Sequence, residues 1–119
     1  MSCSMTVDQV RDESKTETRR DVDTWKNLKP GDRLLLIEKG MGLKKGEKQR
    51  VLAEVEVTEV DVVPLWDIDE DGCKAEGFPN MTPGEFCKFW MDGHGYGRVV
   101  SQNDAMSIEC RRIRWRYLD

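Results

Sequence analysis

The chain has 119 residues, of which 38% are hydrophobic and 35% are charged, and its formal net charge is -4. This length fits one domain, residues 1–119, with a small hydrophobic core. The negative net charge argues against a protein that coats nucleic acid by bulk charge, although it is compatible with a local basic groove.

The cysteine spacing and the absence of a long apolar run argue against several classes of protein. Cys3, Cys73, Cys87 and Cys110 form no CxxC pair, and His94 is the only histidine. This pattern does not predict a zinc site, so we expect no metal and no cofactor. The sequence shows no signal peptide and no run of transmembrane length. We therefore expect free thiols, a reducing cytoplasm and no membrane contact.

The N-terminal part fits two short elements. Residues 3–6 fit a first strand, and residues 7–14 fit a helix that is mostly exposed. Thr6 precedes this helix and Gln9 follows three positions later, which is the pattern of a capping box.

The next six residues, 15–20 (KTETRR), contain no apolar side chain. A charge run of this kind is typical of a solvated turn. If the stretch forms a strand instead, Thr16, Thr18 and Arg20 share one face, because strand side chains alternate. Two hydroxyls and a guanidinium on one face suit a phosphate or another polar ligand.

A helical turn and a strand are predicted next. Val22, Trp25 and Leu28 recur at helical spacing and predict one turn packed onto the sheet. Residues 29–32 (KPGD) are typical of a turn. Residues 33–38 (RLLLIE) follow as a leucine-rich strand and the first clear core element.

Residues 39–50 contain three glycines and five cations, which indicates a basic hairpin loop. This loop either binds a polyanion or is only a polar connection. Residues 51–63 form the longest predicted strand, and Pro64 ends it. The alternation of apolar residues switches near Thr58 and Glu59, which predicts a β-bulge of the kind found where a sheet curls.

Residues 65–68 fit a short helical turn, and residues 69–72 read as an acidic loop. The segment AEGFP at residues 75–79 then places Glu76 beside apolar surface. Because burial disfavours a charged carboxylate, we expect the pKa of Glu76 to rise.

Residues 82–85 (TPGE) begin a helix, with a capping box and a proline at the first helical position. The helix is predicted to end at about Asp92. Phe86, Phe89 and Trp90 form its apolar face and are expected in the core.

Residues 93–97 (GHGYG) form a glycine-rich loop without the P-loop signature. Residues 106–118 form the last predicted strand. Its apolar residues change parity near Arg111 and Arg112, which predicts a second bulge. The opposite face would then carry Arg112, Arg114 and Arg116.

Together, the predicted elements amount to four to six strands and two or three short helices. The two parity switches favour a curled, mostly antiparallel sheet or a small open β-barrel over a flat sheet. The expected fold class is α+β.

The ordered set KTETRR, LKPGDRLLL, a valine-rich strand, AEGFPNMTPGEFCKFW and a hydrophobic last strand resembles the ASCH domain family (activating-signal-cointegrator homology). The resemblance covers residues 5–118. It implies a small β-barrel related to the PUA fold, with a cleft that faces RNA or a nucleotide. The GLKKGEK loop and TRR are also similar to bacteriophage members, which implies the cytoplasm of a bacterial or phage-infected cell.

Bacterial members similar to this chain hydrolyse N4-acetylcytidine with a lysine, a threonine three positions later and a glutamate. The resemblance implies that Lys15, Thr18 and Glu76 match these residues, and that Arg20 matches the arginine of the motif. Lys15 would act as general base, Thr18 as nucleophile or as a holder of water, and Glu76 as proton donor. The spacing around Glu76 and the loop at residues 41–50 depart from the small enzymes.

Several polar residues near these positions are expected to bind the substrate. They are Thr16, Arg19, Arg20, Lys39, Lys44 and Lys45. The partner is a nucleoside or RNA in the cleft. Two alternatives use the same cleft: a non-catalytic module that binds an unstacked base, and a ribonuclease. A third is a phage-borne effector that binds a host protein. The sequence does not indicate an oligomeric state.

Overall fold

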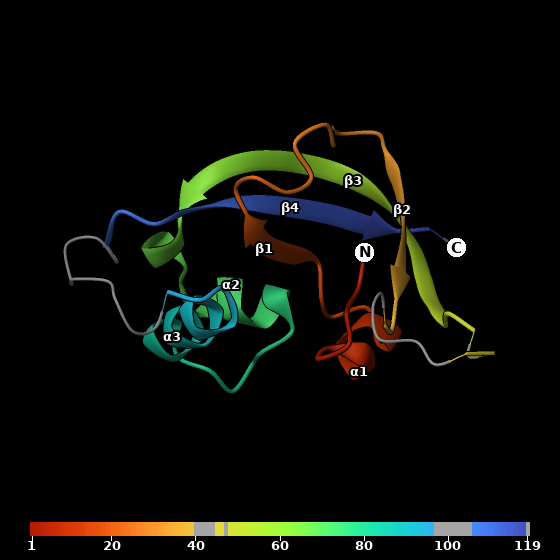
Figure 1. Ribbon diagram of the computed structural model, residues 1–119, viewed down its shortest axis with the longest axis horizontal. Helices are drawn as coiled ribbons and strands as arrows, with labels where there is room; N and C mark the ends of the chain where they lie inside the picture. The colour runs from red at the N-terminus through yellow and green to blue at the C-terminus, as the bar shows by residue number, and fades with distance from the viewer. Residues whose placement is uncertain (40–44, 47, 97–105, 119) are drawn as a thin grey trace.

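The computed structural model describes residues 1–39, 45–46, 48–96 and 106–118 (Figure 1). The elements in chain order are α1 (Val7–Arg11), β1 (Glu17–Asp21), β2 (Arg33–Ile37), β3 (Val51–Pro64), the 3-10 helix η1 (Leu65–Asp67), α2 (Glu70–Glu76), α3 (Pro83–Gly93) and β4 (Glu109–Tyr117). None of the helices in this described part has the length and apolar character needed to cross a membrane.

The four strands form one antiparallel sheet in the order β1-β4-β3-β2. Figure 1 shows β3 and β4 arching along the molecule. The helices α2 and α3 lie near the end of the sheet where β3 ends and β4 begins, and α1 lies near the other end. The predicted α+β class and the curled, mostly antiparallel sheet are therefore confirmed.

The predicted bulge in β3 is also confirmed. Val57 pairs with Trp115, but Glu59 pairs with the next residue, Arg114, so Thr58 is the extra residue on β3. An extra residue reverses the side-chain alternation from that point on. This reversal explains why the apolar parity of β3 changes within one strand.

The second bulge, predicted near Arg111 and Arg112, is wrong. The pairing of β4 with β1 and with β3 runs without a register shift through this region. Cys110 and Ile113 are three positions apart, so they point to opposite faces of an unbroken strand. Each face is covered by its own hydrophobic cluster, one containing Cys110 and Phe86, the other containing Ile113 and Val10. The parity change therefore reflects two cores, one on each face.

The predicted row of arginines on one face of β4 is confirmed. Each arginine forms an ion pair with the acidic residue directly across on β3. The pairs are Arg112 with Asp61, Arg114 with Glu59 and Arg116 with Glu56.

The acidic loop predicted at residues 69–72 is instead the start of α2. The Asp69 side chain caps this helix by accepting a hydrogen bond from the Gly72 N–H at 2.7 Å. Gly77 ends the helix with a φ of 97°, a left-handed conformation that favours glycine. The last residue of this helix is Glu76, one of the residues predicted to be catalytic.

The helix predicted from residue 82 to about residue 92 is confirmed as α3. Thr82 and Glu85 form the expected capping box, and Pro83 occupies the first turn. The predicted strands at residues 33–38 and 51–63 and the helical turn at residues 65–68 are confirmed to within one residue at each end. The last strand begins three residues later than predicted.

Two N-terminal predictions are wrong. The strand predicted at residues 3–6 is reduced to an isolated parallel bridge between Ser2 and Ile37. The helix predicted at residues 7–14 ends at Arg11, and the Thr6 side chain makes no capping hydrogen bond. With two valines as its apolar residues, α1 has little surface to bury and stays short.

The helical turn predicted from Val22, Trp25 and Leu28 does not form. Trp25 has a φ of 56°, outside the right-handed helical region, and it is 36% exposed. Leu28 still packs against the cluster that contains Ile113. The basic loop predicted at residues 39–50 lies mostly outside the described residues.

Candidate functional site

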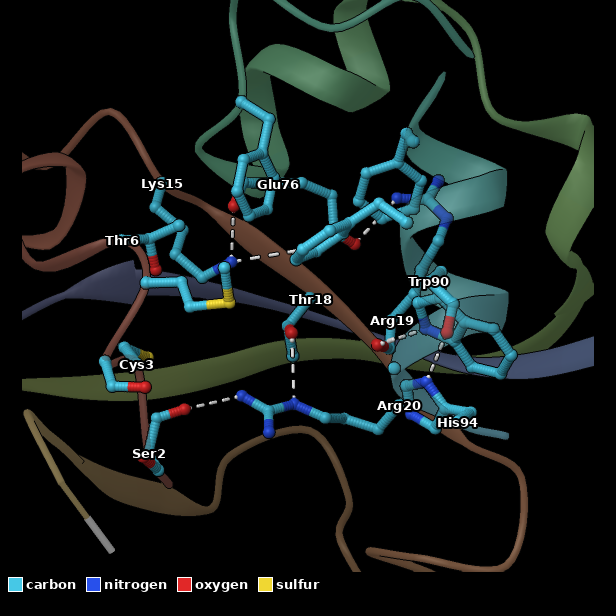
Figure 2. Close-up of a pocket in the computed structure, with 16 residues that line it drawn as sticks. Ser2, Cys3, Thr6, Lys15, Thr18, Arg19, Arg20, Glu76, Trp90 and His94 are labelled. Atoms are coloured by element: carbon cyan, nitrogen blue, oxygen red, sulfur yellow. Dashed lines mark hydrogen bonds and ion pairs between the residues drawn. The ribbon is translucent and has the colours of Figure 1, made fainter. Parts of the chain in front are cut away.

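A cavity of about 300 Å³ lies beside β1 (Figure 2). Its walls come from β1, from the N-terminal residues 2–6, from Glu76 at the end of α2 and from aromatic residues of α3. Lys15, Thr18, Arg19 and Arg20 line it together with Glu76. The three residues predicted as catalytic thus share one cavity.

The polar stretch at residues 15–20 is not a solvated turn, so the prediction from composition is wrong. Lys15, Glu17, Thr18 and Arg19 are only 3–6% exposed, and β1 takes in most of the stretch. The strand alternative is the one observed.

The backbone before β1 is fixed by distant elements. The Thr16 N–H donates to the Ala75 carbonyl of α2 at 2.8 Å, and the Trp115 N–H donates to the Thr16 carbonyl at 3.1 Å. The Lys15 carbonyl accepts from Trp115 Nε1 at 3.1 Å and from the Tyr117 hydroxyl at 2.5 Å. These hydrogen bonds fix the backbone at Lys15, and the Lys15 side chain is buried although residues 15–20 contain no apolar side chain.

Lys15 and Glu76 are in direct contact. Lys15 Nζ donates to the Glu76 backbone carbonyl at 2.5 Å and lies 3.7 Å from Glu76 Oε1. The other carboxylate oxygen, Oε2, accepts from Arg19 Nη1 at 3.0 Å. One carboxylate therefore lies between two buried cations.

The pair belongs to a longer chain of alternating charges. Arg19 also contacts Glu17, and Glu17 accepts from Arg114 Nε at 3.2 Å. The sequence of contacts is Lys15, Glu76, Arg19, Glu17 and Arg114. Buried ions are tolerated when each has a partner of opposite sign, which this chain supplies.

Burial shifts the pKa values of Lys15 and Glu76 in opposite directions. It raises the pKa of Glu76, against the opposing effect of Lys15 and Arg19. It also lowers the pKa of Lys15, although Glu76 and Cys3 act in the opposite direction. Both directions favour the uncharged forms, a free amine and a neutral carboxylic acid. The expected rise in the pKa of Glu76 has its cause in this burial.

Thr18 is held by Arg20. Arg20 Nε donates to Thr18 Oγ1 at 3.1 Å, and Arg20 Nη2 donates to the Ser2 carbonyl at 2.8 Å. A hydroxyl that accepts one bond still has its own proton to give. Arg20 thus orients the Thr18 hydroxyl, and because it also lines the cavity, its role in binding a polar ligand stays a prediction.

The other residues predicted to bind substrate are placed differently. Arg19 lines the cavity, but Thr16 is exposed and is not among the lining residues. Lys39 and Lys45 are exposed and do not line it either, and Lys44 lies outside the described residues.

Several aromatic residues that were expected only in the core also line the cavity. Phe86 and Trp90 are buried as predicted, whereas Phe89, also predicted in the core, is only half-buried. All three form the cavity wall together with Phe78 and His94. Trp90 and His94 are one helical turn apart, a spacing from which a shared wall could have been predicted.

A second cavity of about 280 Å³ shares Arg19 with the first. Glu17, arginines of β4 and aspartates near the start of α2 line it. Across the described residues, no group of three or more His, Cys, Asp and Glu side chains is arranged to hold a metal ion.

Comparison with known proteins identifies the fold. No family model and no curated protein matches the sequence. A crystal structure of an Enterococcus faecalis V583 protein, described by the family model DUF984, matches with a TM-score of 0.61 and 19% identity over 95% of this chain. A crystal structure of an ASCH domain from Lactobacillus crispatus JV V101 matches with a TM-score of 0.58 and 13% identity over 94% of this chain.

The chain spans 66% of the Enterococcus chain and 69% of the Lactobacillus chain. Identities this low establish the fold alone. The protein therefore has an ASCH-like fold, as its sequence resemblance implied.

Proposed function

We propose that the protein is an amidohydrolase that removes the acyl group from an acylated cytidine of the N4-acetylcytidine type. The observation that carries this proposal is the contact between buried Lys15 and Glu76 in a cavity that also holds Thr18. The ASCH-like fold supports it, because bacterial ASCH proteins that resemble this chain hydrolyse N4-acetylcytidine.

The chemistry requires a base, a nucleophile and a proton donor. Neutral Lys15 accepts the proton of the nucleophile, which is the Thr18 hydroxyl or a water molecule bound to it. The nucleophile attacks the acyl carbonyl carbon, and the bond between that carbon and N4 breaks. Glu76 in its neutral form gives a proton to N4, so the products are cytidine and the carboxylic acid. The proton that Lys15 accepted then passes to Glu76, which restores both neutral groups. If Thr18 carries the acyl group, water releases it in a second step.

The amide bond of an N4-acylated cytosine is relatively easy to cleave. The exocyclic nitrogen of cytosine shares its lone pair with the ring, so it leaves more readily than an aliphatic amine. Burial lowers the pKa of Lys15 and raises the pKa of Glu76, and these directions favour a free amine as base and a neutral carboxylic acid as proton donor.

The size of the cavity favours a free nucleoside. About 300 Å³ is at the lower end of the usual range for ligand pockets. Lys39 and Lys45 of the basic loop do not line it. Among the described residues, the size and lining of the cavity thus support a compact ligand more than extended RNA.

The first experiment measures release of cytidine from N4-acetylcytidine by the purified protein. We expect Lys15→Ala and Glu76→Gln each to lower kcat by at least about 100-fold, the usual contribution of a general base or acid. Lys29→Ala and Glu70→Gln are matched controls, because both residues are exposed and outside the cavity. They should keep full activity.

Full activity of both site variants would reject the mechanism. No turnover by the native protein would reject the amidohydrolase and favour RNA binding. In that case, the affinity for single-stranded RNA should fall steeply with salt, since phosphate contacts release counterions.

A further inference from the structure

His94 differs from the other aromatic residues of the cavity wall in its geometry. Phe78 packs against Phe86 and Phe89 with tilted rings, at 53° and 56°. The imidazole of His94 instead lies nearly parallel to the indole of Trp90, with ring centroids 3.8 Å apart and an angle of 16°. Figure 2 shows these two rings at the side of the cavity away from Lys15.

The stacked pair is held rigidly. Trp90 is 4% exposed, and its Nε1 donates to the Arg19 carbonyl at 2.9 Å. His94 Nδ1 lies 2.7 Å from the Trp90 carbonyl, and it must be the donor because a carbonyl oxygen only accepts. Two hydrogen bonds and one stacking contact thus fix the plane of the imidazole before any ligand arrives.

Within the described part of the chain, no second ring is stacked on the His94 imidazole. His94 is an exposed residue that lines the cavity, while Trp90 covers its inner face. A flat, preoriented ring at the wall of a cavity offers a stacking surface for another flat ring. The polar groups Lys15, Thr18 and Glu76 lie across the same cavity, where a substituent on that ring would react.

We propose that His94, held parallel to Trp90, is the stacking surface for the ligand's pyrimidine ring and so selects planar heteroaromatic ligands. This inference rests on the proposed function, since it assigns the base-binding side of the same cavity. His94 is then a specificity-determining residue, and the reacting end of the substrate lies toward Lys15.

The test measures the affinity of cytidine, the product nucleoside, by isothermal titration calorimetry, which does not depend on turnover. His94→Ala should weaken binding by about tenfold, the typical effect of losing one stacking contact. His94→Phe, which keeps a flat ring, should bind within about threefold of the native protein. His94→Gln keeps a polar group without a ring and should behave like His94→Ala.

Tyr96→Ala is the matched control. Tyr96 also lies nearly parallel to Trp90, at 18°, but it does not line the cavity. Cytidine should bind to this variant as to the native protein, with circular dichroism to verify folding. If His94→Ala and His94→Gln bind cytidine as tightly as the native protein, the proposal is wrong.

Two further measurements, of RNA binding and of turnover, distinguish this inference from the proposed function. A short single-stranded oligocytidylate tests whether the base comes from RNA, and His94→Ala should weaken its binding too. In turnover, His94→Ala should raise KM with little change in kcat, unlike Lys15→Ala. Cytidine binding that depends on His94 without any hydrolysis would reject the amidohydrolase and keep the stacking role. No binding of either ligand by the native protein would reject the stacking role, whereas turnover alone decides the amidohydrolase.

Discussion

Glu17 is a buried carboxylate that does not line the first cavity, yet it acts on the residues that do. It contacts Arg19, which also binds the carboxylate of Glu76. Arg19 is thereby shared between two acids, and its hold on Glu76 is weaker than in a simple pair. Burial is the main cause of the raised pKa of Glu76, and the charge of Glu17 adds to the rise.

This arrangement predicts the effect of Glu17→Gln on the pH dependence. Removing the charge of Glu17 should lower the pKa of Glu76, because one of the causes of its rise is lost. Activity that needs protonated Glu76 is lost as pH rises through that pKa. The loss should therefore begin at a lower pH in the variant, as measured by kcat for N4-acetylcytidine against pH.

Glu59→Gln is the control for this prediction. Glu59 also pairs with Arg114, but it is exposed and makes no contact with Arg19 in the described network. Its pH profile should match that of the native protein. A profile of Glu17→Gln that moves to higher pH would show that Glu17 does not act through Glu76.

Among the secondary-structure elements, the C-terminal end of α2 packs closely against the N-terminal segment at Gly77. A Cβ at this position would lie 2.9 Å from Cγ2 of Thr6, closer than side chains approach one another. The φ of 97° adds strain for any residue with a side chain. Both Glu76, which precedes this glycine, and Thr6 line the cavity.

Gly77→Ala should therefore lower the free energy of unfolding by about 1–2 kcal/mol from backbone strain alone. It should also lower hydrolytic activity, since Thr6 or Glu76 must shift to admit the methyl group. Denaturant unfolding and the N4-acetylcytidine assay measure the two effects. Gly84→Ala is the control: a Cβ there meets nothing within 4 Å, and we expect no loss of stability.

Some elements are readable from the sequence because their signals are local. The alternation in β3 revealed both the strand and the bulge at Thr58, and the capping box revealed the start of α3. The helix α2 has a cap at Asp69 and a glycine stop at Gly77, but its seven residues contain no apolar periodicity. Such a short helix is defined by packing more than by pattern.

The burial of Lys15 could not be read from the sequence, since it depends on distant partners. Glu76 is 61 positions away, and the side chains of β4 that hold the Lys15 carbonyl are 100 and 102 positions away. A stretch of charged residues is costly to bury, and for this reason its composition indicated a solvated turn. The resemblance to the ASCH family selected Lys15, Thr18 and Glu76, and their placement in one cavity required the structure.

For the whole molecule, the buried charges are a thermodynamic cost that the hydrophobic clusters on either face must offset. A small domain has little stability to spare. Replacing a buried ion pair with apolar residues of similar size is often neutral or stabilising, by about 1–4 kcal/mol. The Lys15–Glu76 pair is a suitable case, because Arg19 would keep its contact with Glu17.

We therefore expect the double variant Lys15→Met/Glu76→Leu to be at least as stable as the native protein and to be inactive. The single variant Lys15→Met should be less stable than the double variant, because Glu76 stays buried and loses its contact with Lys15. Urea unfolding of the three proteins at one pH tests this order. A double variant less stable than Lys15→Met would show that the charged pair contributes net stability.

The hydrogen bonds from β4 to the Lys15 carbonyl determine how late in protein synthesis this part of the cavity can form. Lys15 leaves the ribosome early, whereas Trp115 and Tyr117 are among the last described residues to be synthesised. Contacts this far apart in sequence form late, because a long loop must close first. Until β4 joins β1, the Lys15 carbonyl lacks both of the hydrogen bonds that hold it in place. Under the proposed function, activity would therefore begin only after β4 has joined the sheet.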